Sequence, residues 1–241
     1  MNIVLPMAGR GSRFADVGYK LPKPLIDVRG RPMYTWALDS LPLNLADCLI
    51  FVCLQEHLEE FDLKSDIDKR YAEYNPQVIA LNKVTEGQAC TVLEAAEFID
   101  NEKPLLIYNA DTYCHSDLAE LLAADPTVDG VLGVFEAPGD KWSFAKVDAN
   151  ERVVETAEKV RISDWACNGM YYFRKGTEYV RHTNAMVQQD DRTNGEFYVA
   201  PLYNRMIASG DSVRIDKSDF VWGLGTPEDL DYFLKNYPES N

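Results

Sequence analysis

The sequence predicts an α/β protein built on a doubly wound sheet that is mostly parallel but mixed, with helices on both faces. Short apolar runs alternate with helix-like segments through the first half of the chain. The run at 105–108 is apolar on both faces, as in a strand of a parallel sheet. A glycine- and arginine-rich loop follows the first run, and ligands of such folds bind beyond the carboxyl ends of the strands.

Each element of this fold has its own local signal. Strand-like apolar runs occupy residues 3–5, 49–52, 77–81, 105–108 and 131–135. Helical spacing predicts three helices in between, one beginning at Pro32, one around Val92 to Ile99, and one capped by Ser116. The alternation predicts parallel pairing of the strands.

The second half of the chain is less regular and predicts antiparallel excursions at 142–147, 153–156 and 169–173. A closing helix is clearly marked, because Thr226 supplies an N-cap and Pro227 the first helical position. No internal repeat or Pro/Gly/Ser-rich linker is present, so residues 1–241 are expected to form a single domain.

Composition excludes several classes of function. The formal net charge is −15, which argues against binding to nucleic acid or to anionic membranes. No apolar run approaches the roughly 18 residues that cross a bilayer, and a cytoplasmic location is expected. The five cysteines are scattered singly and the three histidines lack zinc-binding spacing, so reduced thiols and no zinc site are predicted.

Positive charge is concentrated at the N-terminus. Residues 1–33 contain six basic and two acidic residues, whereas the remainder has 18 basic and 37 acidic residues. Screening acts over about 8 Å at physiological salt, so distant acids matter little to an anion held here. A solvated basic face is the alternative interpretation.

The loop after the first strand indicates what that anion is. Gly9 and Gly11 let backbone N–H groups approach a phosphate. Phe14 stands where a dinucleotide-binding loop needs a third glycine, and the Gly-Lys-Ser/Thr of a Walker loop is absent. Arg13 and Lys23 instead supply charges suited to a triphosphate.

Three segments, Met7–Phe14, Leu21–Leu25 and Gly30–Met33, resemble the signature of the sugar-phosphate nucleotidyltransferases, the NDP-sugar pyrophosphorylase-like family. The resemblance implies a Rossmann-like, GT-A-like nucleotidyltransferase fold, with a nucleotide-binding half at 1–125 and an acceptor-binding half at 126–241. It also implies nucleotide-binding and catalytic residues. Those that hold the triphosphate are Ala8, Gly9, Arg10, Gly11, Ser12 and Arg13, with Lys23 on the phosphates around the reacting phosphorus.

Further matches follow in the family's order. Thr85–Ala89 resembles the segment beside the base and ribose, with Gly87 and Gln88 nearest to the nucleotide. Asn109–Asp111 resembles the strand end whose aspartate binds Mg²⁺, which makes Asp111 the implied metal ligand and a catalytic residue. The implied acceptor-binding residues are Lys159, Asn168, Gly169 and Glu196.

One departure concerns the metal. Gly223 stands where the family usually has a second metal-binding aspartate, so either Asp111 acts alone or Asp219 or Glu196 substitutes. Simpler interpretations also stay open for individual residues. Asp111 can cap a helix, Gln88 and Lys159 can be surface residues, Asn168 a turn residue and Glu196 a solvated acid.

The implied reaction transfers a nucleoside monophosphate from a triphosphate to a sugar 1-phosphate, with Mg²⁺, and releases pyrophosphate. A phosphate nucleophile has a second pKa of about 6 and arrives ionised, so no general base is required. Arg13, Lys23 and Asp111 are the expected catalytic residues. Surface-polysaccharide precursors are implied as products by the resemblance.

Three alternatives remain at this point. A related enzyme would transfer a cytidylyl group to a non-sugar phosphate such as phosphocholine. A glycosyltransferase of similar topology usually has Asp-x-Asp, whereas Thr112 and Tyr113 follow Asp111 here. Gly223 favours a catalytically impaired nucleotide-binding protein. The base, the acceptor, and the choice between a monomer and a homo-oligomer are not readable from the sequence.

Overall fold

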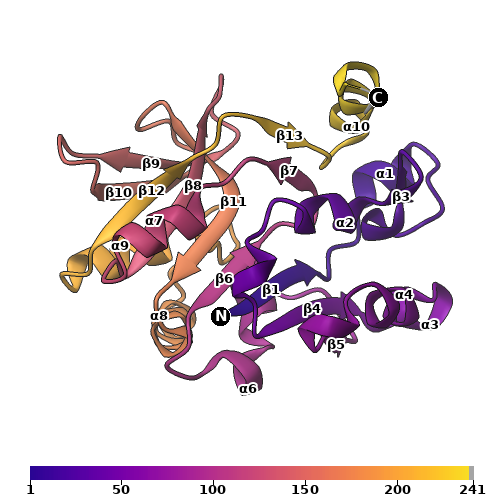
Figure 1. Cartoon of the computed structure of the whole chain (residues 1–241), viewed down its shortest axis with the longest axis horizontal. Helices are drawn as coiled ribbons and strands as arrows, with labels where there is room; N and C mark the ends of the chain where they lie inside the picture. Colours follow the sequence, from indigo (N-terminus) through magenta and orange to yellow (C-terminus); the bar gives the residue numbers. More distant parts are fainter. Residues whose placement is uncertain (239–241) are drawn as a thin grey trace.

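The computed structural model describes residues 1–238, and a mixed nine-stranded sheet forms its centre (Figure 1). Its main path runs β10-β9-β11-β6-β1-β4-β5, and β8 joins β11 to β12. The strands are β1 (Asn2–Met7), β4 (Cys48–Leu54), β5 (Gln77–Leu81), β6 (Leu105–Tyr108), β8 (Gly130–Glu136), β9 (Ser143–Val147), β10 (Val153–Glu158), β11 (Trp165–Phe173) and β12 (Val213–Lys217).

Strands of the first half pair in parallel, and those of the second half are mostly antiparallel. β1 lies between β6 and β4 with parallel register to both, and β4 continues to β5. β11 runs antiparallel to β6 and β8 and carries a bulge between Cys167 and Tyr171. The predicted parallel core and the antiparallel excursions are therefore both confirmed.

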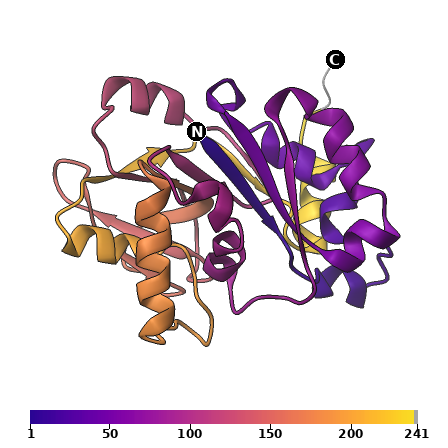
Figure 2. The same cartoon turned by 90° about the horizontal axis from the view of Figure 1, so that it is seen from below.

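Helices cover both faces of the sheet, and successive β1 side chains therefore pack into two different cores. Val4 belongs to a core packed by α5 (Gln88–Leu93), α6 (Ala96–Ile99), α8 (Gly176–Gln188) and α9 (Leu202–Ala208). Ile3 and Leu5 belong to a core packed by α2 (Met33–Leu38), α4 (Leu63–Arg70) and α7 (Leu118–Ala124). Figure 2 shows α8, in orange, crossing one of these faces. The predicted α/β fold class is thus confirmed.

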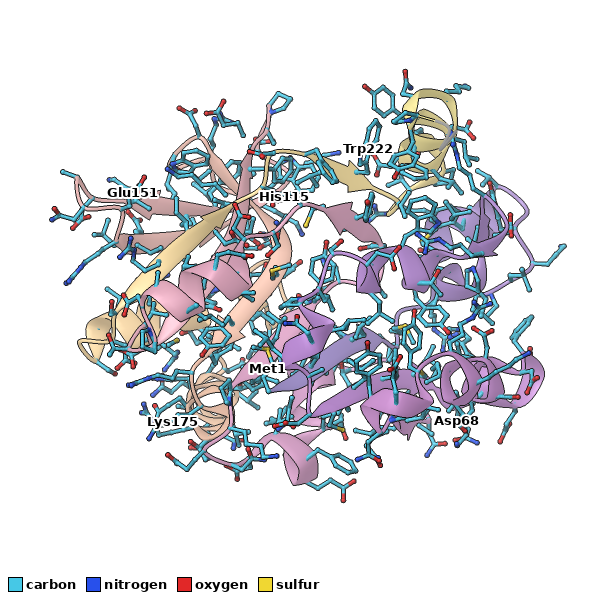
Figure 3. All side chains as sticks on the ribbon, viewed as in Figure 1. Met1, Asp68, His115, Glu151, Lys175 and Trp222 are labelled. Atoms are coloured by element: carbon cyan, nitrogen blue, oxygen red, sulfur yellow. The ribbon has the colours of Figure 1, made fainter. Side chains whose placement is uncertain are left out.

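Smaller elements complete the chain. A third core joins α10 (Pro227–Asn236) to the segment around α2. Trp222, labelled in Figure 3, packs against the ring of Tyr237 at a distance of 5.8 Å between ring centroids. The remaining β-strands are β2 (Asp27–Val28), β3 (Arg31–Pro32), β7 (Thr112–Cys114) and β13 (Val221–Gly223), and the remaining α-helices are α1 (Ser12–Asp16) and α3 (Gln55–Glu60). Short 3-10 helices cover Lys23–Leu25, Leu43–Leu45 and Ala72–Tyr74. In residues 1–238, no helix is long and apolar enough to cross a membrane.

Three helix boundaries differ from the sequence-based expectation. Pro32 is the N-cap of α2 and not its first residue. The helix predicted over 92–99 is divided into α5 and α6 by a turn at Glu94 and Ala95. Ser116 stands one residue before the N-cap of α7, although its Oγ accepts from Leu118 N at 3.2 Å.

The closing helix gives the first testable prediction. The Thr226 side chain accepts from Asp229 N at 3.1 Å, which satisfies one of the free N–H groups at the start of α10. Thr226→Ala should lower the free energy of unfolding by about 1 kcal/mol. In a chain of this size, thermal unfolding should then shift down by about 2–4 °C. Thr226→Ser is the matched control, and an unshifted Ala variant would contradict the capping role.

Candidate functional site

A cavity of about 510 Å³ opens where β1 and β6 end. The loops after these two strands meet there because the strands are neighbours and parallel. Segments from the second half of the chain close its other side. The lining residues come from 6–14, Lys23, Pro24, Val84 to Thr91, 109–111, Glu196, Tyr198 and Gly225.

The glycine loop forms one wall of the cavity. Ala8, Gly9, Gly11, Ser12 and Arg13 all line it. Gly11 has a left-handed φ of 61°, and a Cβ there would lie 3.0 Å from Lys23 Cβ. Glycine at this position therefore lets the loop pack directly against Lys23.

Arg10 is placed differently from the sequence-based expectation. Its side chain is 66% exposed, and its guanidinium lies 3.6 Å from the Glu56 carboxylate. It does not line the cavity. In this conformation the side chain points outward from the loop, and Arg10 does not face the space where a phosphate would bind.

Lys23 and Asp111 form an ion pair at the cavity wall. Lys23 Nζ donates to Asp111 Oδ2, and the two side chains are 24% and 22% exposed. Gly225 closes over the pair, because a Cβ there would lie 3.1 Å from that oxygen. Burial would raise the pKa of Asp111, but the Lys23 ammonium, helped by Thr112 and Arg13, holds that pKa below its usual value. Asp111 is thus a carboxylate beside cations.

The two acids considered as a second metal ligand, Asp219 and Glu196, lie in different places. The Asp219 side chain is 89% exposed and lies 3.8 Å from His115 Nδ1 rather than beside Asp111. Glu196 does line the cavity. A Cβ at Gly223 would lie 3.7 Å from Asp229 Cγ, so the Asp229 carboxyl group occupies the space beside Gly223.

The base-side loop is fastened to the second half of the chain by backbone contacts. Phe197 N donates to Glu86 O at 2.9 Å, and Ala89 N donates to Phe197 O at 3.0 Å. Gly87 has φ 134°, and a Cβ there would lie 2.5 Å from Phe197 O. Gln88 Nε2 donates to Asn109 Oδ1 at 2.5 Å, which aligns the loop with the end of β6.

The predicted acceptor residues separate into two groups. Glu196 lines the cavity, and Lys159 Nζ reaches it indirectly by donating to Tyr198 Oη at 2.8 Å. Asn168 and Gly169 do not line it. Asn168 is 3% exposed and donates to Ser218 Oγ at 2.8 Å. These two residues therefore belong to the β11 bulge behind the cavity, and their acceptor-binding role stays a prediction.

Tyr198, Asn109 and Gly225 are cavity residues that the sequence-based reasoning did not select. Asn109 stands inside the matched segment Asn109–Asp111, and Tyr198 lies two residues after Glu196, so position near a selected residue was the available signal. Gly225 carried no separate signal, because its importance lies in its approach to Asp111.

A separate group of metal-ligand side chains lies away from this cavity. Glu178 and His182 on α8 and Asp211 after α9 bring one ligand atom each within 4.8 Å of one another. Arg181 contacts two of these residues. Its Nη2 lies 2.9 Å from His182 Nε2, and it donates a hydrogen bond to Glu178. The positive charge of the Arg181 guanidinium therefore already lies beside these potential metal ligands.

The glycine loop, the cations and the strand-end carboxylate are features of an α/β protein that binds phosphorylated ligands. The chain belongs to the nucleotidyl transferase family, whose model matches residues 2–236. This confirms the family indicated by the sequence motifs.

Individual relatives extend the comparison. A UTP–glucose-1-phosphate uridylyltransferase of Haloferax volcanii is 26% identical, covering 96% of this chain and 94% of its own length. A D-glycero-alpha-D-manno-heptose 1-phosphate guanylyltransferase of Campylobacter jejuni is 21% identical, covering 98% and 100%. The chain spans only 56% of the bifunctional protein GlmU of Methanococcus vannielii, at 23% identity over 98% of this chain.

A solved structure agrees with this family. The nucleoside-diphosphate-sugar pyrophosphorylase of Vibrio cholerae superimposes with a TM-score of 0.83 at 28% identity. The superposition covers 97% of this chain and 100% of that protein. The similarity therefore extends over both halves of the chain.

The Gly87 contact gives a prediction about the site's scaffold. Gly87→Ala should lower the free energy of unfolding by about 1–3 kcal/mol, because its backbone conformation is essentially restricted to glycine. The new Cβ should also separate the loop from Phe197. Hydrogen exchange should then accelerate at the amides of Phe197 and Ala89.

Gly139→Ala is the matched control, since Gly139 also has a positive φ, 79°, but no atom within 4 Å of the added Cβ. Unchanged exchange at Phe197 and Ala89 in the Gly87 variant would contradict the contact.

Proposed function

We propose that this protein transfers a nucleoside monophosphate from a nucleoside triphosphate to a sugar 1-phosphate, giving a nucleoside diphosphate sugar and pyrophosphate. The observation that carries the proposal is the meeting of the glycine loop, Lys23 and Asp111 at one cavity. The acceptor class is supported by the relatives, because those described above act by name on glucose 1-phosphate and on a heptose 1-phosphate.

The triphosphate is assigned to the glycine-loop side of the cavity. The backbone of Ala8, Gly9, Gly11 and Ser12, with the Arg13 side chain, would hold its phosphates. Lys23 stands between this loop and Asp111, so it can contact the phosphates on either side of the bond that breaks. Gly87 and Gln88, which line the opposite wall, would contact the base and ribose.

No enzyme base is needed for the attack. A sugar 1-phosphate is already ionised at pH 7, and its oxygen forms the new bond to the α-phosphorus while the bond to pyrophosphate breaks. Arg13 and Lys23 stabilise the negative charge that moves onto the departing pyrophosphate. The protein's contribution is then alignment of two phosphates and neutralisation of charge.

Magnesium is the proposed metal, and Asp111 is its proposed ligand. A single carboxylate fits Mg²⁺, which keeps several waters and takes phosphate oxygens as ligands. Bound there, the ion would supply charge neutralisation to the phosphates. Asp111 suits this role because it stays ionised beside Lys23. Glu196 and Asp229 are the remaining acids to test for support.

The acceptor is assigned to Lys159 and Glu196, in the half at 126–241, and the nucleotide to the half at 1–125. Asn168 and Gly169 are proposed with them as acceptor-binding residues, and Arg10 is proposed as a nucleotide-binding residue. A cytoplasmic location, a role in surface-polysaccharide precursors and independence from nucleic acid are parts of the same proposal. Transfer of cytidylyl groups to phosphocholine and binding without catalysis are alternative outcomes of the test below.

The first experiment combines each of four nucleoside triphosphates with glucose 1-phosphate, other sugar 1-phosphates and phosphocholine, with Mg²⁺, and measures pyrophosphate. We expect release with at least one sugar 1-phosphate. Asp111→Ala should lower turnover about a thousandfold, and Arg13→Ala or Lys23→Ala about a hundredfold, as for loss of a transition-state contact.

Tyr232→Phe, an exposed position on α10, is the control variant. Nucleotide binding without pyrophosphate release from any acceptor would contradict catalysis, and wild-type turnover in Asp111→Ala would contradict the metal assignment.

The Lys23–Asp111 pair makes a prediction about metal affinity. Lys23 donates to Asp111 Oδ2, so its ammonium would repel a cation that binds the same carboxylate. Lys23→Met should therefore bind Mn²⁺, a spectroscopic substitute for Mg²⁺, about tenfold more tightly in the absence of nucleotide. Mn²⁺ titration followed by electron paramagnetic resonance measures this change.

Lys20→Met, whose charge lies outside the cavity lining, is the control. Equal Mn²⁺ affinity in the Lys23 variant and the wild type would contradict competition for Asp111.

A further inference from the structure

Lys159 keeps a charge that no carboxylate neutralises directly. In residues 1–238 it forms no ion pair, and its ammonium donates instead to Tyr198 Oη at 2.8 Å. A phenol is neutral and accepts one of the three ammonium N–H donors, which leaves two donors and the full charge free. Lys23 differs, because Asp111 cancels its charge.

The backbone at Lys159 is held in an uncommon conformation. Its φ is 56°, in the left-handed region that residues other than glycine rarely adopt. Its N–H donates to Trp142 O at 2.9 Å, immediately after β10 ends at Glu158. Such a conformation costs free energy and persists only where surrounding contacts hold it.

Tyr198 connects this lysine to the cavity. Lys159 does not line the cavity, whereas Tyr198 does, together with Glu196. The Lys159 ammonium lies 5.0 Å from the Tyr198 ring centroid, within range of a cation–π interaction. Tyr198 is itself fixed, because the preceding residue Phe197 is bound through its backbone to the base-side loop.

Charge at this position is well maintained. The hydrogen bond to Tyr198 raises the pKa of Lys159, against the opposing effect of burial. Glu158 and Glu196 also favour the charged form without contacting the ammonium. A cation at the cavity edge, with two free donors, is suited to a phosphate monoester.

We infer that Tyr198 is a positioning residue whose hydroxyl holds the Lys159 ammonium against the phosphate of the acceptor. The inference rests on the proposed function, since it assigns a task within the acceptor half of the same site. It makes the specificity for a phosphorylated acceptor depend on a tyrosine hydroxyl that does not need to touch the acceptor.

The test is Tyr198→Phe, which removes the hydroxyl but keeps the ring beneath the ammonium. With the sugar 1-phosphate selected by the panel, we expect the acceptor KM to rise about three- to tenfold. The triphosphate KM should stay within twofold of the wild type. Lys159→Met should raise the acceptor KM further, and Tyr198→Phe should add nothing in the Lys159→Met background.

Tyr232→Phe is the matched control, because Tyr232 is 62% exposed on α10. Three outcomes overturn the inference: an unchanged acceptor KM, equal increases in both KM values, or additive effects with Lys159→Met. The second of these would indicate a structural role, which thermal unfolding of each variant also reports.

A binding measurement separates this inference from the proposed function. Inorganic phosphate serves as the probe in calorimetric titrations of the wild type, Tyr198→Phe and Lys159→Met. Weaker binding by both variants is expected even if no acceptor in the panel is turned over, an outcome that would count against the proposed function alone. Phosphate affinity unchanged in Tyr198→Phe overturns the inference.

Discussion

The parallel pairing of β1 with β6 is the constraint on which the site depends. Val4 is in register with Ile107, so continuation of both strands would bring Ala8 beside Asp111. The chain leaves the sheet on both strands before that point, which delivers the glycine loop and the carboxylate to the same place. The pairing is secure because Ile3, Val4 and Leu5 are fully buried between helices on both faces.

The β11 bulge acts on the same site from the other side of β6. Gly169 has φ 94°, and a Cβ there would lie 2.2 Å from Asn109 Nδ2. Its missing side chain makes room for Asn109, which in turn accepts from Gln88. The bulge therefore sets the position of a cavity residue from behind the cavity wall.

Local patterns predicted the elements better than they predicted the contacts between them. The strands at 77–81 and 105–108 were identified with their boundaries, and the cap at Thr226 was identified with its residue, because these signals are contained in a few neighbouring positions. The Lys23–Asp111 pair and the outward turn of Arg10 were not predicted, since they depend on segments far apart in sequence. The position of the Asp229 carboxyl group beside Gly223 was not predicted either, because it depends on how α10 packs against β13.

The two lysines of the site use different partners, and the difference has a consequence for binding. Lys23 is neutralised by a carboxylate, so under the proposed function its charge would become available to a phosphate when Asp111 binds a metal ion. The triphosphate and the metal should therefore favour each other's binding, and linkage makes that effect reciprocal. Lys159 is held by a neutral phenol, so its charge is available at all times. Under the proposed function, the acceptor phosphate would meet a cation whose availability does not depend on the metal. The two substrates would then be drawn to the cavity by independent charges.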